Sequence, residues 1–324
     1  MKHVFIINPA SGKEKSKELL QDKIADACGR SEVEYEIYFT KGPLDAVEYI
    51  KNYCKSNEAR EQICFYACGG DGTFCEVVNG VYQSENNELV SVGIIPVGTG
   101  NDFVKCFSGT DGFLDIQAQV DGDEVAIDLV DCNGFCSANM INIGFDCEVA
   151  VKTSQIKRSP LVPSGLAYIF GLVLTLAKKP TAHIKSLRIN GETVKENVEY
   201  LLTTFANGRY CGGGFLSNPF ADLCDGKIDA MFINNMRRAK FLSLVGLYKK
   251  GEHIVPKTAH LITHAKCDSV EIEFSQSTNV CIDGEIKSFD KILLTVQRGA
   301  LRLRVPRKPK AAEESEKDEA ACAL

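Results

Sequence analysis

The stretch GGDGT, residues 69–73, separates an apolar run at residues 63–67 from a segment in which apolar residues recur at helical spacing. An apolar run of this length, bounded by glycine, is typical of a buried β-strand. The spacing that follows predicts a helix with one apolar face, made of Phe74, Val77, Val78 and Val81. Strand, tight glycine turn and helix in succession indicate an α/β layer, in which helices cover a parallel sheet.

Two more polar loops with glycine follow predicted strands in the first half. NPASGK at residues 8–13 follows the run 4–7, and PVGTGND at residues 96–102 follows the run 92–95. Residues 33–39 alternate as a half-buried strand does. Loops at the carboxyl ends of parallel strands meet at one edge of the sheet, so we expect the three loops to line one site. Glycines allow a phosphate to approach the backbone closely, and the helix that follows offers free N–H groups. Together these features favour polyphosphate as the ligand.

Neither of the two general phosphate-binding motifs fits these loops. GxxxxGK[ST] would need glycine where Ile7 stands and serine or threonine where Glu14 stands. GxGxxG would need glycine where Cys75 or Phe103 stands. The sequence therefore predicts a phosphate site of another kind.

The chain has 324 residues, enough for about two domains. From about residue 126 the helical spacing gives way to β-like runs separated by Gly and Asn, which predicts a mostly β second domain. These runs are residues 125–130, 137–143, 200–205, 228–233, 270–274, 279–282 and, last, 292–305. Residues 311–324 carry five acidic side chains against one lysine and are predicted to be a disordered acidic tail.

Composition limits the class of protein. Hydrophobic residues make up 44% and charged residues 25%, as in folded soluble domains. The net charge of −6 argues against nucleic acid as a partner, because affinity for phosphate backbones needs clustered Lys and Arg. No apolar leader precedes the first predicted strand, so we expect the 14 cysteines to be reduced, mostly buried thiols of a cytoplasmic protein. Their closest spacings, CxxxC at 64–68 and 132–136, do not match a zinc site.

Taken in order, the motifs resemble the catalytic domain family of diacylglycerol kinases and sphingosine kinases, in particular the soluble bacterial lipid kinases. In the first half the resemblance rests on NPxxG at 8–12, GGDGT at 69–73 and GTGNDF at 98–103. It covers about residues 1–305, and its further matches are IDL at 127–129, NIGFD at 142–146, Asn207 with GGG at 212–214, Pro219 with DGKI at 225–228, and DGE at 283–285.

This resemblance implies an N-terminal Rossmann-like α/β nucleotide-binding domain, related to NAD kinase and phosphofructokinase, and a β-sandwich second domain. The C-terminal strands are expected to return to the first domain. The resulting domains are residues 1–126 plus 291–308 and residues 127–290.

The resemblance also implies ATP as co-substrate with Mg²⁺. Asp71, between glycines, is expected to reach Mg²⁺, bound water or a substrate hydroxyl, although an Asp there can also cap the next helix. Glu285 matches the position that takes the proton from the lipid hydroxyl, although after Asp-Gly it would otherwise be a surface residue of a hairpin. Asp102 and Asp128 are expected to complete a water and Mg²⁺ network. The expected nucleotide-binding residues are Asn8, Ser11, Gly12, Thr40, Gly70, Gly72, Thr73, Thr99 and Asn101.

A second Mg²⁺ site is implied in the second domain, at an Asp-Gly turn. In this sequence the implied ligands are the carboxylate of Asp225, the backbone carbonyl of Lys227 and the carboxylate of Asp222. These are hard oxygen ligands of the kind that Mg²⁺ takes. The approach FADLC, residues 220–224, departs from the family pattern around Asp222.

Residues 149–191 contain no Asp or Glu, although the chain as a whole is acidic. They enclose the apolar run 161–177, and we expect this window to dock on an anionic membrane surface, making the protein peripherally membrane-associated. The alternatives are a core helix with solvated ends and a homodimer contact. The cations of the window are Lys152, Lys157, Arg158, Lys178, Lys179, Lys185 and Arg188.

The resulting expectation is an ATP-dependent lipid kinase that transfers the γ-phosphate to a lipid hydroxyl, with diacylglycerol, giving phosphatidic acid, as the first choice of substrate. Two alternatives stay open. One is a kinase of a soluble substrate, because NAD kinases share GGDGT, and the other is a non-catalytic lipid or nucleotide sensor. The motifs do not select the lipid, because selection depends on the shape of the pocket.

Overall fold

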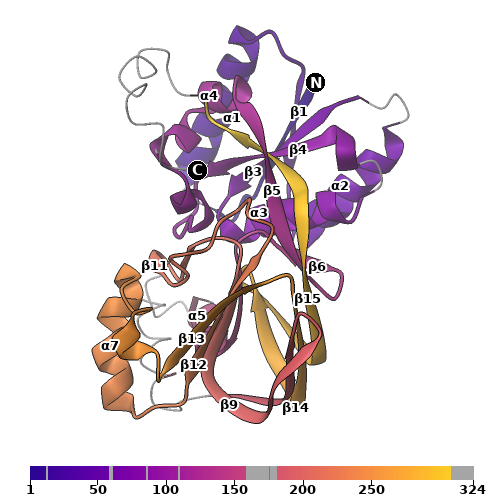
Figure 1. Ribbon diagram of the computed structural model, residues 1–324. Coiled ribbons are helices and arrows are strands. Elements are labelled where there is room, and N and C mark those ends of the chain that lie inside the picture. Colours follow the sequence, from indigo (N-terminus) through magenta and orange to yellow (C-terminus); the bar gives the residue numbers. More distant parts are fainter. Residues whose placement is uncertain are drawn as a thin grey trace, which may run out of the picture. The chain divides into compact units, whose positions relative to one another are not determined.

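The computed structural model describes residues 1–11, 14–57, 61–84, 87–108, 110–157, 175 and 181–307 (Figure 1). Two compact units divide the chain. Unit 1 is Met1–Ala126 together with the chain from Leu301, and unit 2 is Ile127–Ala300. The chain leaves unit 1 where the sequence loses its helical spacing, and returns to it at Leu301, later than the expected residue 291.

A parallel sheet forms the centre of unit 1. Its strand order is β4-β3-β1-β2, and Arg302 and Leu303 at the end of β15 pair in parallel with the free edge of β4. Strands β3 and β4 are buried along their whole length, as expected where helices cover both faces of a sheet. The bounds are β1 (Lys2–Ile7), β2 (Tyr35–Phe39), β3 (Ile63–Gly69) and β4 (Val90–Pro96), so that each predicted strand is present.

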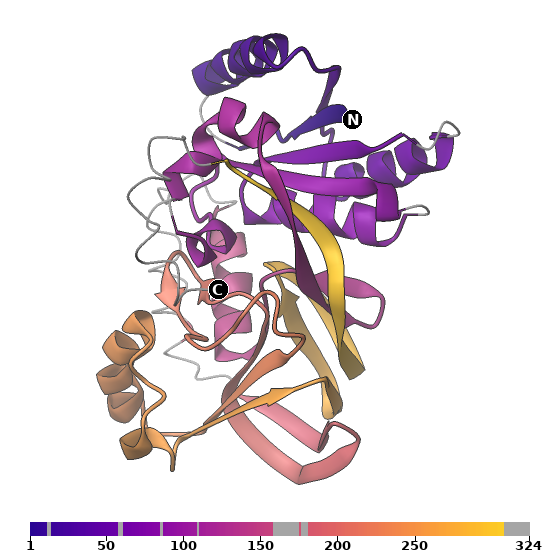
Figure 2. The same ribbon diagram turned by 45° about the horizontal axis from the view of Figure 1, so that its top comes forward.

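Helices cover this sheet on its two faces (Figure 2). The cluster around Phe5, Tyr66 and Ile95 takes up Ile24 of α1 and Ile116 of α4 on one face. Helices α2 and α3 pack against each other, and the predicted apolar face of α3 is buried. The bounds are α1 (Glu14–Arg30), α2 (Asp45–Ser56), α3 (Asp71–Tyr82) and α4 (Ile116–Val120), with 3₁₀ turns at η1 (Asn87–Leu89), η2 (Phe103–Cys106) and η3 (Thr110–Leu114).

Unit 2 consists mainly of antiparallel strands. The strands β7, β9, β8 and β14 pair in a closed cycle, because β9 and β14 each pair with β8 over one half and with β7 over the other. The mostly β character expected of the second domain is confirmed. The bounds are β5 (Asp123–Cys132), β6 (Phe135–Ser137), β7 (Met140–Gly144), β8 (Ala182–Ile189), β9 (Glu192–Ala206), β10 (Tyr210–Cys211), β11 (Phe215–Leu216), β12 (Ile228–Asn234), β13 (Ile262–Cys267), β14 (Ser269–Ile282) and β15 (Glu285–Val305).

In the described part of unit 2, the strands are accompanied by α5 (Phe145–Lys157), α7 (Arg238–Lys250) and the 3₁₀ turn η5 (Pro256–Thr258). Phe145 of α5 and Leu244 of α7 join Met231 and Ile262 of the sheet in one buried cluster. Figure 1 shows α7, in orange, along the outside of unit 2.

Several expectations fall on residues outside those that the structure describes. They are Gly12, Arg158, the apolar run 161–177 except Thr175, the lysines 178 and 179, and the tail 311–324. The described cysteines are all free thiols and most are buried, as expected. Within the described ranges, no helix has the length and apolar character needed to cross a membrane.

Candidate active site

Close backbone packing joins the loops that follow β3 and β4. Gly98 donates its N–H to the carbonyl of Gly69 over 3.1 Å. A Cβ on Gly98 would lie 2.4 Å from the Cα of Gly70, which is shorter than any real contact. Only glycine fits position 98, and the two loops are thereby held side by side.

Asp71 lies at the centre of this pair of loops. Its Oδ1 accepts the backbone N–H of Asp102 at 2.7 Å and that of Phe103 at 3.3 Å. Burial, with the Asp102 charge adding to it, raises the pKa of Asp71 above its ordinary value, and the two N–H donors oppose this. The N-cap of α3 is Gly70, and no side chain caps the helix. Asp71 therefore ties the second loop to the first and is not a helix cap.

The second carboxylate oxygen of Asp71 faces Gly100. A Cβ on Gly100 would lie 2.7 Å from Oδ2, so a side chain there would cover this oxygen. Among the described residues, no hydrogen bond to Oδ2 is present. A small open depression is lined by Gly70, Asp71, Asn101 and Phe103, among others. This oxygen fits a role as a direct ligand of Mg²⁺, or as an acceptor for water bound to it.

Asp102 has a cationic partner in its own loop. It is buried, and its Oδ1 accepts Lys105 Nζ at 2.6 Å. Lys105 also donates to the carbonyl of Gly100 at 2.9 Å. Sequence reasoning missed Lys105, although a lysine three residues after an aspartate at the start of a helical turn is a recognisable pairing signal.

Asn8 joins the loop after β1 to the loop after β3. Its Nδ2 donates to Thr73 Oγ1 at 3.1 Å, and its Oδ1 accepts the N–H of Ala10 at 2.9 Å. Ser11 follows directly and donates its backbone N–H to the carbonyl of Asn8. The structure therefore brings together the three loops that were expected to line one site.

The other expected nucleotide residues of unit 1 differ in their surroundings. Thr40 is buried at the end of β2, where its N–H donates to Ile7. Thr99 is exposed on the loop after β4. Asn101 has a φ of 51° and donates Nδ2 to the carbonyls of Pro96 and Gly98, so its side chain holds the loop in shape. Gly72 has open space around its Cα.

In unit 2, Glu285 begins β15 directly after a two-residue hairpin turn. Asp283 and Gly284 have φ values of 47° and 95°, which is the primed turn that Asp-Gly predicts. Glu285 is half-buried, and within the described part of the chain its carboxylate makes no hydrogen bond or ion pair. It is therefore available to accept a proton.

Asp283, which sequence reasoning did not select, anchors this turn. Its carboxylate accepts the Ser137 hydroxyl at 2.6 Å and the N–H groups of Ala138 at 2.8 Å and Met140 at 2.7 Å, with Asn139 at 3.3 Å. Burial raises the pKa of Asp283 to about 6 against these donors. A signal for it existed, because an Asp at the first position of an Asp-Gly turn often binds nearby backbone N–H groups.

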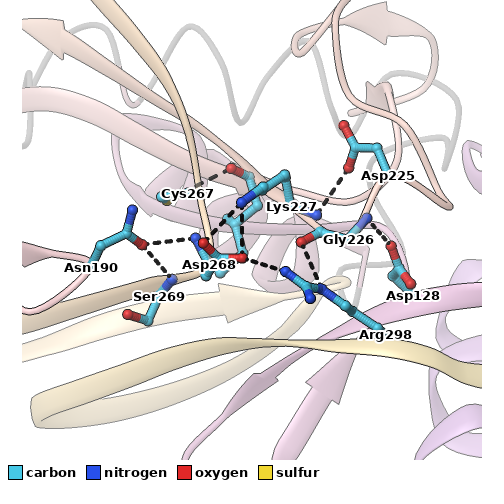
Figure 3. A network of polar contacts seen from close by, with 10 residues as sticks. Asp128, Asn190, Asp225, Gly226, Lys227, Cys267, Asp268, Ser269 and Arg298 are labelled. Carbon is cyan, nitrogen blue, oxygen red and sulfur yellow. Dashed lines mark hydrogen bonds and ion pairs between the residues drawn. The ribbon is translucent and has the colours of Figure 1, made fainter.

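Asp128 also binds backbone N–H groups of unit 2, as Figure 3 shows for Gly226. Its Oδ2 accepts Gly226 N at 2.6 Å, and its Oδ1 accepts Gly299 N at 2.7 Å. The side chain is buried. Asp128 therefore links β5 to the Asp-Gly turn at residues 225–226 and to β15, all within unit 2.

The turn expected to hold the second Mg²⁺ carries its own cations (Figure 3). Asp225 accepts the N–H of Lys227 at 3.0 Å through Oδ1 and pairs with Lys266 at 2.5 Å through Oδ2. The Lys227 ammonium pairs with Asp268, which also binds Arg298. Asp222 accepts the N–H of Cys224. The described residues include no group of three or more His, Cys, Asp or Glu side chains placed for a metal. A cation already neutralises Asp225, so this turn does not fit Mg²⁺ as it stands.

Two family models match the chain in succession. Residues 2–132 match the diacylglycerol kinase catalytic domain, and residues 139–305 match the YegS C-terminal NAD kinase beta sandwich-like domain. The chain belongs to the diacylglycerol kinase and YegS family of lipid kinases. This lipid kinase family accounts for the α/β unit followed by a β-sandwich-like unit.

Individual relatives align with most of the chain. A "Diacylglycerol kinase" of Bacillus subtilis (strain 168) is 27% identical over 283 residues, covering 87% of this chain and 88% of the relative. A "Probable lipid kinase YegS-like" protein of Pseudomonas aeruginosa is 29% identical over 240 residues, covering 74% and 76%. The crystal structure of a diacylglycerol kinase from Bacillus anthracis str. Sterne superposes with a TM-score of 0.71 at 22% identity, covering 96% of this chain and 98% of that one, which shows a shared fold.

Proposed function

We propose that this lipid kinase transfers the γ-phosphate of ATP to the hydroxyl of diacylglycerol, giving phosphatidic acid. The observation that carries the proposal is Asp71, whose carboxylate is held between glycine loops by the N–H groups of Asp102 and Phe103, with one oxygen left over. A carboxylate so placed can bind the Mg²⁺ of a nucleotide–Mg²⁺ complex, either directly or through a water molecule. Because phosphoryl transfer depends mainly on positioning and charge stabilisation, this is the arrangement that it needs.

In the proposed reaction the lipid hydroxyl oxygen forms a bond with the γ-phosphorus. The bond from that phosphorus to the bridging oxygen of the β-phosphate breaks, and ADP leaves. The hydroxyl proton passes to the carboxylate of Glu285, which has no other partner among the described residues. This base need not be strong, because in a loose transition state the proton leaves late. Bound Mg²⁺ would neutralise charge on the β- and γ-phosphate oxygens.

The loops that follow β1, β3 and β4 are assigned to ATP. Asn8 and Thr73 are joined by a hydrogen bond, and Gly70 and Gly98 let the backbone approach a phosphate without a side chain between them. The first N–H groups of α3 have no acceptor within the helix and can donate to an anion, and the positive end of the helix dipole lies there.

The test is transfer of labelled γ-phosphate from ATP, with Mg²⁺, to lipids in mixed micelles. The panel contains diacylglycerol, monoacylglycerol, a sphingoid base and phosphatidylglycerol, with NAD as a soluble comparator. Asp71→Ala and Glu285→Gln are assayed beside the wild type, and Asp111→Asn, at an exposed position, is the matched control.

We expect label on diacylglycerol with the wild type and the control, and a loss of about 100-fold or more with each of the two variants. Label on another lipid of the panel would identify that lipid as the substrate and would still support a lipid kinase reaction. Label on NAD alone would move the activity to a soluble substrate. ATP binding without transfer to any acceptor would refute the catalytic proposal.

A further inference from the structure

Helix α7 has one face buried against the core of unit 2 and one face outside it. Leu244 is buried with Met231 and Ile262, while Phe241 and Tyr248 pack around this cluster. The hydroxyl of Tyr248 donates to Asp146 at 2.9 Å and fixes the helix to α5. These contacts fix which face of α7 is buried, and therefore which face lies outside the core.

Helix α7 and the segments that flank it carry exposed cations. Among the described side chains of residues 237–257, five cations are exposed, and Glu252 is the one acid in this stretch of sequence. No ion pair with an acid forms at any of the five within the described residues. Lys249 lies 5.8 Å from the ring of Phe215. The five cations, called here the α7 cation face, are Arg237, Lys240, Lys249, Lys250 and Lys257.

Several other cations of unit 2 do have acidic partners. Lys291 pairs with Glu271 and Lys227 pairs with Asp268. The same holds for the two β8 cations of the basic window 149–191, because Lys185 pairs with Glu273 at 2.5 Å and Arg188 approaches Glu271 at 3.9 Å. These two β8 cations are already neutralised, whereas the α7 cation face is not.

Apolar side chains are exposed among these cations. Leu242, in the middle of α7, is 57% exposed, which exceeds every other large hydrophobic side chain of the described residues. Val255, in the turn after α7, is 41% exposed. An exposed leucine beside exposed lysines, here Leu242 with Lys249 and Lys250, can lie in a membrane interface, where the apolar side chain enters the acyl boundary and the ammonium groups meet anionic headgroups.

We propose that the α7 cation face, with Leu242, docks the protein on an anionic lipid bilayer. Charge complementarity selects this partner. The chain carries a net charge of −6, so an anionic surface attracts it only through a local cluster of unpaired cations. The inference rests on the proposed function, because a kinase of a membrane lipid must reach its substrate at a bilayer.

The test separates docking from catalysis. Binding is measured by sedimentation with vesicles of phosphatidylglycerol and phosphatidylcholine, or of phosphatidylcholine alone, without ATP. Phosphoryl transfer is measured separately with dioctanoylglycerol dispersed in detergent micelles. The test variant carries Lys240→Glu, Lys249→Glu and Lys250→Glu. The control carries Lys23→Glu, Lys55→Glu and Lys195→Glu, which changes the net charge equally at exposed positions elsewhere.

We expect the wild type and the control to bind anionic vesicles and the α7 variant to bind at least about 10-fold more weakly, with equal thermal unfolding midpoints and equal micelle activity. Raising the salt concentration should weaken wild-type binding. An α7 variant that binds as well as the control would overturn the proposal. So would a wild type that binds neutral and anionic vesicles equally, or that binds heparin but no vesicle. Vesicle binding through α7 without lipid phosphorylation would leave the docking face in place and refute the proposed function alone.

Discussion

The carboxylate of Asp71 accepts the backbone N–H of Asp102 over 2.7 Å, although the two residues are 31 positions apart. This hydrogen bond ties the loop after β3 to the loop after β4. It uses one oxygen of Asp71 and leaves the other facing Gly100. The same side chain therefore has two functions, since it holds the glycine loops together and presents a charged oxygen beside them.

Asp71→Asn separates these two functions. The amide oxygen can still accept from Asp102, while the charge is lost. We expect the fold and the midpoint of thermal unfolding to change little, and kcat for phosphoryl transfer to fall about 100-fold or more. Rates with labelled ATP give the readout, and Asp111→Asn should keep wild-type kcat. A wild-type rate in Asp71→Asn would show that the charge is not needed.

Gly98→Ala should separate the two loops. Its Cβ would meet the Cα of Gly70 at 2.4 Å, and backbone cannot move aside as a side chain can. We expect the free energy of unfolding to fall by about 1–3 kcal/mol and the affinity for ATP to fall at least about 10-fold. Urea unfolding and calorimetric titration with ATP measure the two effects.

The matched glycine variant is Gly29→Ala, near the end of α1, where a Cβ meets nothing within 4 Å. Alanine is favoured over glycine in a helix, so this variant should gain about 0.5–1 kcal/mol and bind ATP as the wild type does. Equal losses in both variants would show that the Gly98–Gly70 approach is not the cause.

Asp283→Asn should destabilise unit 2. The carboxylate accepts from Ser137, Ala138 and Met140, whereas an amide has a single acceptor oxygen and would turn its NH₂ toward backbone N–H groups. We expect a loss of about 2–4 kcal/mol in the free energy of unfolding at pH 7, measured in urea. Asp290→Asn, at an exposed position of β15, should change it by less than about 0.5 kcal/mol. Similar values for both variants would contradict the anchoring role.

Lys266 should decide whether the Asp225 turn binds Mg²⁺. In the wild type the Lys266 ammonium lies 2.5 Å from Asp225 Oδ2. We expect millimolar Mg²⁺ to raise the thermal midpoint of the wild type no more than NaCl of equal ionic strength does. In Lys266→Met the freed carboxylate should make Mg²⁺ stabilising, and adding Asp225→Asn should remove that effect. A specific Mg²⁺ shift in the wild type would show that the ion displaces the lysine.

His3 should make the protein less stable in acid. Its ring is buried beside Tyr66, and burial lowers the pKa of His3 to about 4. The unfolded chain, with a pKa near 6.5, takes up the proton first, so stability is present above about pH 6.5 and is lost as pH falls toward 4. Between pH 7 and pH 5 the wild type should lose about 2 kcal/mol more than His3→Asn, measured by urea unfolding at both values. Parallel losses would mean that the pKa of His3 is the same in the folded and the unfolded chain.

Elements whose pattern is local were predictable from the sequence. The buried strands β1, β3 and β4 follow from short apolar runs, and α3 follows from its helical spacing after GGDGT. Strand β8 was missed because its alternation of buried and exposed residues breaks between Ile184 and Leu187, where its pairing with β14 shifts register. Helix α7 was missed although Phe241, Leu244 and Tyr248 recur at helical spacing, because the surrounding pattern is β-like.

The sequence by itself determined which short segments carry residue types suited to phosphoryl transfer. Glycines at the ends of parallel strands, an aspartate between them and an Asp-Gly turn before a glutamate are properties of short segments, in which neighbouring residues set the backbone conformation. Tertiary structure alone decided what each carboxylate binds. Asp128 accepts from residues 98 and 171 positions away, and Asp225 meets a lysine 41 positions away. The reason is physical, because a hydrogen bond or ion pair depends on distance in space, and only folding brings such donors within reach of the acceptor.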